Sequence, residues 1–198
     1  FAAIPSTSGT ASEITAFSVI TDTANHIKYP LVSPEIVPDI AILDPALPAT
    51  MPPHITANMG MDVMAHAVEA LVSTAATSFT DPYAVEAIKL VYTYLPKAFS
   101  NPHDMEARYH MHNASSLAGM AFTNASLGLV HSLAHKIGGE FGVTHGLANA
   151  ILLPDIINYN RQSTDKYRIA EKALGVTDLA EAIRELNKKL DIPVSFRK

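Results

Sequence analysis

Residues 55–75, ITANMGMDVMAHAVEALVSTA, decide the fold of this chain and carry its first chemical signal. Apolar residues recur there at intervals of three and four, which predicts one long helix beginning after Pro52. Asp62 and His66 interrupt the apolar run four residues apart, so their side chains lie on one face of that helix. Because an unpaired buried carboxylate is costly, Asp62 needs either a cation or hydrogen-bond donors.

A second group of polar residues follows in residues 131–146, HSLAHKIGGEFGVTHG. His131 and His135 are four residues apart, and His145 comes ten residues after His135. Imidazole and carboxylate groups are the usual ligands of a divalent transition metal. With Asp62 and His66 there are five candidates, more than the four protein ligands of a common metal site. Spacing alone does not say whether His131 or His135 is a ligand.

The local sequence gives weaker evidence on the roles of His145, Glu69 and the remaining histidines. His145 falls just before or within the first turn of a predicted helix, where the helix dipole favours the neutral imidazole that binds metal. Glu69 shares the face of Asp62 and His66, and either orients an imidazole from behind or forms an ordinary salt bridge. Four further histidines lie in less apolar contexts and are predicted to be surface or cap residues: His54, His103, His110 and His112.

The remainder of the chain after Pro52 also favours helices. Asp81 and Pro82 offer an N-cap followed by a proline at the first helical position, and Asn124 is expected to cap the helix that carries His131. The predicted helices after the first span residues 81–94, 102–122, 124–139, 145–153, 166–174 and 178–190.

Residues 1–47 have a different character. Their short segments rich in β-branched and aromatic residues, several closed by proline, are typical of strands, and a hydroxyl-rich turn lies between the first two. The expected extended segments are residues 1–4, 14–22, 29–34 and 38–45. We therefore predict a mainly α protein, with an all-helical metal-binding domain over residues 48–198 attached to a β-containing region over residues 1–47.

Composition excludes several classes of function. The 198 residues carry a net charge of −5 with scattered Lys and Arg, which argues against nucleic-acid binding. There is no cysteine, so a metal must be held by histidine and carboxylate. No apolar run approaches the roughly 18 residues of a membrane span. The first residues have neither an initiator Met nor the pattern of a signal peptide, and the chain looks like a piece of something larger.

The order of these motifs resembles the iron-dependent (group III) alcohol dehydrogenases. The resemblance covers about 160 residues with similar spacing between motifs, and is more specific than any one of them. It rests on AIPSTSGTASEIT (3–15), LDPAL (43–47), GMDVMAHAVEA (60–70), AGMAFTNASLGLVHSLAHKIG (118–138) and THGLANAILLP (144–154).

The resemblance implies a division of roles among the histidines. The metal ligands of the family, one Asp and three His, correspond to Asp62, His66, His131 and His145, whereas His135 corresponds to a pocket histidine that is not a ligand and is our candidate for moving the alcohol proton. It also implies an NAD(P)-linked alcohol dehydrogenase or aldehyde reductase that uses Fe(II) or Zn(II) with NAD or NADP. Residues expected near the dinucleotide are Ser6, Thr7, Thr10, Thr15, Phe17, Lys28 and Leu47.

One departure from the family matters. Its members are about twice as long and begin with an α/β nucleotide-binding domain that carries a Gly-rich phosphate loop, for which this sequence has no match. Residues 1–47 are therefore expected to be the end of that domain, and the last helices of the family are also expected to be missing. The chain then contains the metal site but only one wall of the dinucleotide site. We therefore expect it to bind metal but to catalyse the reaction poorly on its own.

Two other readings remain open at this point: a metal-dependent hydrolase or lyase using the same residues, and a catalytically incompetent metal-binding fragment. A hydrolase needs no NAD(P)H, and a fragment without function in catalysis need not retain iron or zinc. The resemblance further leads us to expect a small alcohol or aldehyde as substrate, a cytoplasmic location, a homo-oligomer of two or more copies, and no nucleic-acid or membrane partner.

Overall fold

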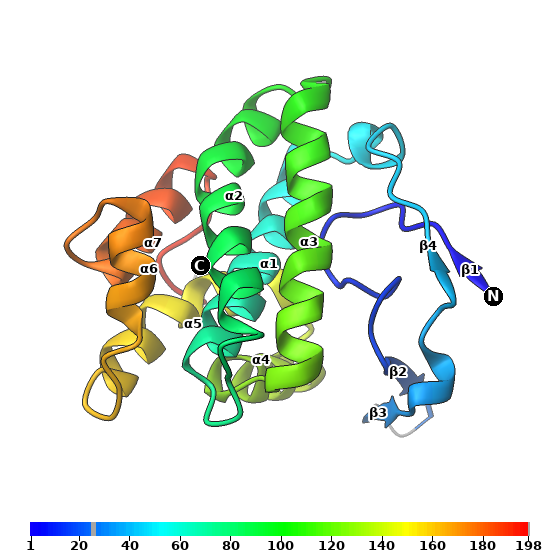
Figure 1. The fold of residues 1–198 in the computed structure, drawn as a ribbon, viewed down its shortest axis with the longest axis horizontal. Coiled ribbons are helices and arrows are strands. Elements are labelled where there is room, and N and C mark those ends of the chain that lie inside the picture. The colour runs from blue at the N-terminus through cyan, green and yellow to red at the C-terminus, as the bar shows by residue number, and fades with distance from the viewer. Residues whose placement is uncertain (25–26, 198) are drawn as a thin grey trace.

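Two parts are visible in the computed structural model, which describes residues 1–24 and 27–197 (Figure 1). A group of packed helices forms the larger part, and the N-terminal segments with their short strands lie along one side of it, next to α3. The mainly α architecture expected from the sequence is confirmed. The helices are α1 (Pro53–Val72), α2 (Asp81–Ser100), α3 (Met105–Ala125), α4 (Leu129–Phe141), α5 (His145–Asn160), α6 (Tyr167–Leu174) and α7 (Leu179–Lys189).

Helix α1 is the central element of the helical part. It packs against α2, α3, α4, α5 and α6, and nearly all of its residues from Thr56 to Leu71 are buried. Apolar residues are spread around this helix, and even its polar residues Asp62, His66 and Glu69 are buried, so it has no solvated face over this range. A Cβ on Gly60 would lie 2.3 Å from a methyl carbon of Leu95, so glycine there lets α2 pack closely on α1.

Helix α2 extends further than predicted. The expected end at Tyr94 is wrong, because the helix continues through Pro96 to Ser100. Proline removes one backbone hydrogen bond from a helix, but Leu95 and Ala98 on either side of it are fully buried, and their packing outweighs that loss. The N-cap is Thr80 rather than Asp81, a shift of one residue.

The ends of α3 and α4 also differ from expectation. Asn124 does not cap α4, because it lies in the last turn of α3 and donates from Nδ2 to the carbonyl of Met120. Helix α4 does not end at the Gly138–Gly139 pair; it continues to Phe141, and Gly142 terminates it with a left-handed backbone at φ +67°. The left-handed conformation that ends α4 is thus adopted by Gly142 and not by the Gly138–Gly139 pair.

The N-terminal region contains two small pairs of strands. Strand β1 (Ala2–Ala3) runs parallel to β4 (Ile40–Ala41), and β2 (Phe17–Asp22) pairs with β3 (Ile27–Val32) in an antiparallel hairpin whose register joins Phe17 to Val32. Two short 3₁₀ helices, η1 (Pro34–Ile36) and η2 (Leu47–Thr50), lead from this region toward α1. These strands occur in the segments where the sequence predicts extended structure.

The N-terminal region is joined to α3 by a row of close contacts that we call the α3 seam: Ser8, Ala11, Glu13 and Ile14 on one side, and His112, Ser116 and Gly119 on the other. A Cβ on Gly119 would lie 2.5 Å from the Cβ of Ala11, so glycine allows the loop to rest on the helix. The buried Glu13 carboxylate accepts a hydrogen bond of 2.6 Å from the Ser116 hydroxyl. Packing and buried polar contacts therefore fix the loop before β2.

The predicted C-terminal helices agree with α6 and α7 to within one residue at most ends. Asp178 caps α7, since its carboxylate accepts from the backbone N–H of Glu181 at 3.0 Å. Among the described residues, no helix is both long and apolar enough to cross a membrane.

Candidate metal centre

The candidate metal centre is assembled from three helices. Asp62 lies in the buried middle of α1, His131 in the first turn of α4, and His145 is the first residue of α5. A Cβ on Gly146 would lie 2.1 Å from the carbonyl oxygen of Asn58 in α1, so glycine is needed for the start of α5 to rest on that helix. This close approach brings His145 beside Asp62.

Three of the expected ligands converge on one place. In the described part of the chain, Asp62, His131 and His145 each bring one ligand atom within 4.8 Å of the other two. The Oδ1 atom of Asp62 lies 3.6 Å from Nε2 of His131 and 3.4 Å from Nε2 of His145. Asp62 and His131 are buried, whereas the side chain of His145 is 32% exposed, so the group is open to solvent on the His145 side.

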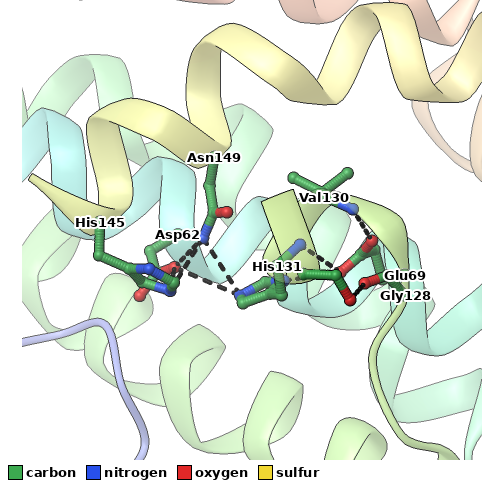
Figure 2. A network of polar contacts seen from close by, with 8 residues as sticks. Asp62, Glu69, Gly128, Val130, His131, His145 and Asn149 are labelled. Carbon is green, nitrogen blue, oxygen red and sulfur yellow. Dashed lines mark hydrogen bonds and ion pairs between the residues drawn. The ribbon is translucent and has the colours of Figure 1, made fainter. Parts of the chain in front are cut away.

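Asn149 completes this group and was missed in the sequence. Its Nδ2 donates to Asp62 Oδ1 at 2.6 Å and lies 3.2 Å from Nε2 of His131 and 3.2 Å from Nε2 of His145 (Figure 2). The signal was present, because Asn149 follows His145 by four residues and is the one polar residue of the run GLANAILL. We call Asp62, His131 and His145 the ligand cluster, and Asn149 is its neighbour.

Glu69 holds His131 from the side opposite Asp62. Its Oε2 lies 2.6 Å from Nδ1 of His131, and its Oε1 accepts from the backbone N–H of Val130 at 2.6 Å (Figure 2). This contact fixes the ring so that Nε2 faces the ligand cluster, which is the arrangement a carboxylate behind a metal-bound imidazole provides. Of the two roles open to Glu69 in the sequence, the structure has the one in which it orients an imidazole.

His66 lies next to the ligand cluster rather than within it. Its ring stacks on that of His131 with centroids 4.4 Å apart, and on Phe122 at 4.5 Å on the other side. Its Nδ1 is buried and has no hydrogen-bond partner in the described part of the chain. Burial lowers the pKa of His66 to about 3, so the ring is neutral at physiological pH and keeps a lone pair available.

The charges around the cluster favour a cation. Burial raises the pKa of Asp62, but the neighbouring His66, His131 and His145 outweigh it and hold the pKa well below its usual range. Burial alone would lower the pKa of His131, yet its contacts with Asp62 and Glu69 raise it to about 9. The two buried carboxylates thus favour positive charge on the His131 ring that lies between them.

These residues fit a bound metal ion. Oxygen from one carboxylate and nitrogen from imidazoles are the donor set of an Fe(II) or Zn(II) site, and their ligand atoms already face a common point. The orphaned Nδ1 of His66 belongs to a neutral imidazole beside that group. The chemistry of the cluster is therefore that of a divalent transition-metal centre.

Comparison with known proteins agrees with this chemistry. The family model "Fe-containing alcohol dehydrogenase family, C-terminal" matches residues 56–198, and the model "Iron-containing alcohol dehydrogenase" matches residues 1–45. This chain belongs to the iron-containing alcohol dehydrogenase family. The predicted resemblance is thereby confirmed.

Individual relatives extend the family assignment along the whole chain. An NADPH-dependent butanol dehydrogenase of Clostridium saccharobutylicum is 48% identical over 100% of this chain and 53% of its own length. The iron-containing alcohol dehydrogenase of Thermococcus thioreducens has 43% identity and a TM-score of 0.90 over 96% of this chain and 50% of its own. A sulfoacetaldehyde reductase of Bifidobacterium kashiwanohense, solved in complex with NAD⁺, has 35% identity and a TM-score of 0.92 over 97% of this chain and 52% of its own.

This chain thus spans about half the length of the relatives it matches. The part that it shares with them contains the whole ligand cluster. What the complete relatives catalyse and bind is accordingly carried to this chain only as a proposal.

His135 is placed at the rim of the cluster. It lies one turn after His131 on α4, its side chain is exposed, and its ring centroid is 4.8 Å from that of His145 and 6.5 Å from that of His131. It is not a member of the group of converging ligand atoms found among the described residues. Its position between the cluster and solvent suits a group that exchanges protons.

The residues expected near a dinucleotide are spread along the N-terminal region. Thr15 is buried and Thr7 partly buried, whereas Ser6, Thr10 and Leu47 are exposed. Phe17 reaches the metal centre through one intermediate: its ring is 6.1 Å from Phe122, which in turn stacks on His66. Lys28 lies in β3, but the placement of its side chain is outside what the structure describes.

The expectation that His112 is a surface or cap residue is wrong. His112 is 2% exposed, and its Nδ1 lies 2.8 Å from the Ser8 hydroxyl in the α3 seam. Its sequence context, RYHMHN, is polar and therefore suggested exposure. Arg108, one turn earlier, is nevertheless buried too, and its guanidinium donates to Thr56 Oγ1 at 2.9 Å. Buried partners from outside the helix were not visible in the local sequence.

Proposed function

We propose that this chain supplies the metal centre and one wall of the dinucleotide site of an NAD(P)-linked alcohol dehydrogenase or aldehyde reductase acting on a small alcohol. The observation that carries the proposal is the convergence of Asp62, His131 and His145 in a chain of the iron-containing alcohol dehydrogenase family. The butanol dehydrogenase relative supports a short alcohol as substrate. We further propose a division at residue 47, with residues 1–47 belonging to the nucleotide-binding part and residues 48–198 to the metal-binding part.

The proposed ligands are Asp62, His66, His131 and His145, and the proposed ion is Fe(II), with Zn(II) as the alternative that the same donors accept. An ion held by these residues would supply Lewis-acid polarisation of an alcohol or aldehyde oxygen, and a bound nicotinamide would supply or accept the hydride. The carboxylate of Glu69 accepts from Nδ1 of His131 and so keeps the opposite ring nitrogen directed at the cluster.

His135 is proposed to move the alcohol proton. The proposal is supported by its exposed side chain and by the 4.8 Å between its ring and that of His145, which put an imidazole between the cluster and solvent. An imidazole can both accept and release a proton in general acid–base catalysis. His135 therefore acts in proton transfer in this proposal and not in holding the ion.

The dinucleotide, NAD or NADP, is proposed to lie against the N-terminal region. The NAD⁺ complex of the sulfoacetaldehyde reductase and the NADPH dependence of the butanol dehydrogenase support either form. The ring sequence from Phe17 through Phe122 to His66 supports a nicotinamide site close to the ligand cluster. The residues proposed to contact the cofactor are Ser6, Thr7, Thr10, Thr15, Phe17, Lys28 and Leu47.

We also propose a cytoplasmic location and assembly into a dimer or larger homo-oligomer, as expected from the sequence. The oligomeric state is checked by light scattering of the purified chain, with a mass of one 21.2 kDa copy counting against assembly.

The function is tested in a chimera in which this chain replaces the matching half of the Clostridium saccharobutylicum enzyme. After chelation and reloading with Fe(II) or Zn(II), the chimera should oxidise NAD(P)H with butyraldehyde, and Asp62→Ala should abolish that activity. The chain alone should turn over poorly under the same conditions. A chimera that folds and binds metal but shows no nucleotide-dependent reduction would contradict the proposed function, and hydrolysis without nucleotide would favour the hydrolase instead.

A further inference from the structure

Asn149 has a fully buried side-chain amide, and its nitrogen and oxygen differ in their hydrogen bonding. Its Nδ2 donates to the Oδ1 of Asp62 at 2.6 Å and lies 3.2 Å from the Nε2 atoms of both His131 and His145. Its own Oδ1 is buried without a hydrogen-bond partner in the described part of the chain. The side chain is therefore held in place through its donor end alone.

The donor lies where the ligand atoms point. An amide N–H directed at a carboxylate oxygen uses the same lone pair that this oxygen would offer to a cation. The shortest of the three contacts, 2.6 Å to Asp62, is made by the group with the full negative charge. The amide nitrogen lies within 3.2 Å of all three ligand atoms, so a cation held by the same three atoms would displace it from Asp62.

We propose that Asn149 is a positioning residue that serves as the internal partner of the ligand cluster when no cation is bound, keeps the cluster assembled in that state, and competes with the metal for the position among the three ligand atoms. This inference rests on the proposed metal site. Asn149 then lowers the affinity of the cluster for metal and stabilises the metal-free fold.

The physical reason for such a residue is the burial of Asp62. The carboxylate is 1% exposed, and a buried charge without a donor strongly destabilises a folded chain. With Asn149 in place, the helices α1, α4 and α5 can come together before a metal arrives. Affinity for the ion is then lower than the same ligands would give without the amide.

The test compares Asn149→Ala with Asn187→Ala in this chain, freed of metal by chelation and titrated with Zn(II) or Co(II). Asn187 is a matched control, because it is also a buried amide whose Nδ2 donates, at 2.7 Å to the carbonyl of Ala150, and whose Oδ1 has no partner among the described residues. Both variants should lower the melting temperature of the metal-free chain. Asn149→Ala should bind Zn(II) about tenfold more tightly, as expected when a competing charge-assisted hydrogen bond is removed, whereas Asn187→Ala should stay within about twofold of wild type.

The outcomes separate this inference from the proposed metal site. If wild type binds the ion and Asn149→Ala binds it equally or more weakly, the role of Asn149 is overturned while the site stands. If wild type binds neither ion, the metal site fails, and the competition fails with it.

A second measurement does not depend on the folding of a variant. In wild type, the side-chain amide protons of Asn149 should show slow exchange with solvent by NMR in the metal-free chain, and should shift and exchange faster when Zn(II) is added. Amide protons that stay unchanged on loading would overturn the proposal, and those of Asn187 provide the internal reference.

Discussion

The helical part and the N-terminal region are built on different principles. In the helical part, the large apolar side chains of the central helices, such as Leu71, Ile88 and Leu95, are 0% exposed. In the N-terminal region, Val32 and Ile40 on the strands are 61% and 59% exposed. The central helices thus bury their apolar side chains against one another, whereas the N-terminal region leaves strand side chains uncovered and is joined to the helical part at the α3 seam.

The difference between the two regions also explains where the proposed metal ligands and dinucleotide contacts lie. The ligand cluster is held by buried helices that pack on one another, so its geometry is fixed within this chain. The residues proposed to contact the dinucleotide lie on the less buried side, where a second surface is needed to complete a site. The predictions that follow test this difference, beginning with the largest effect.

Substitution of leucine should affect the two regions very differently. Leu95→Ala removes a fully buried side chain that packs on Gly60 of α1, and should lower the free energy of unfolding by about 2–5 kcal/mol. Leu31→Ala removes a side chain that is 49% exposed in β3 and should change it by about 0.5 kcal/mol or less. Urea denaturation followed by circular dichroism measures both, and equal losses would contradict the distinction between the regions.

Gly146→Ala should damage the metal centre more than the fold. The new Cβ would meet the Asn58 backbone at 2.1 Å, which cannot yield as a side chain would, so α5 must move away from α1. We expect a loss of about 1–3 kcal/mol in stability, and weaker Zn(II) binding because His145 moves with the helix. The control is Gly139→Ala in α4, where no atom lies within 4 Å; unchanged Zn(II) affinity in Gly146→Ala would contradict this account.

Gly119→Ala should loosen the N-terminal region alone. The added methyl group would meet Ala11 at 2.5 Å in the α3 seam, and the weakly buried side of that contact can move more readily than α3. A cost of about 1 kcal/mol, with faster proteolysis within residues 1–47 and unchanged helical circular dichroism, is the expected result. Cleavage that appears first within α1 or α2 would show that the two regions are not independent in this way.

The smallest effect should be a pH dependence at the same seam. Burial lowers the pKa of His112, opposed in part by Glu13 and Asp44, so the folded chain binds this proton less readily than the unfolded chain. The stabilising contribution of His112 is therefore present above the unfolded pKa of about 6.5 and is lost as the pH falls below it. The stability difference between wild type and His112→Gln should shrink between about pH 7.5 and pH 5, and a growing difference would be inconsistent with burial of the neutral ring.

Much of the helical part could be predicted from sequence because its signals are local. The periodicity around Asp62 predicts α1, and spacings of four put the candidate ligands on common helix faces. The failures arise where distant contacts decide. Helix α2 continues through Pro96 because neighbouring residues are buried against other helices. The contact of His112 with Ser8 cannot be predicted from the residues next to His112 in sequence.

The site follows the same rule. His145 is recognisable from its residue type and its place at a helix start, but its approach to Asp62 depends on Gly146 meeting the backbone of another helix. Asn149 has the spacing of four from His145, but its contacts with Asp62 and His131 depend on the packing of α1 and α4 around it. Local sequence therefore predicts candidate ligands better than it predicts the residues that hold them.

The most direct test of the metal centre is the stoichiometry of metal retained by the chain after chelation, reloading with Fe(II) or Zn(II), and dialysis. We predict about one ion per chain in wild type and in His135→Ala, and none in Asp62→Ala or His145→Ala, since these two remove converging ligand atoms. Retention of the ion in Asp62→Ala, or its loss in His135→Ala, would contradict the proposed assignment of ligands and of the proton-transfer residue.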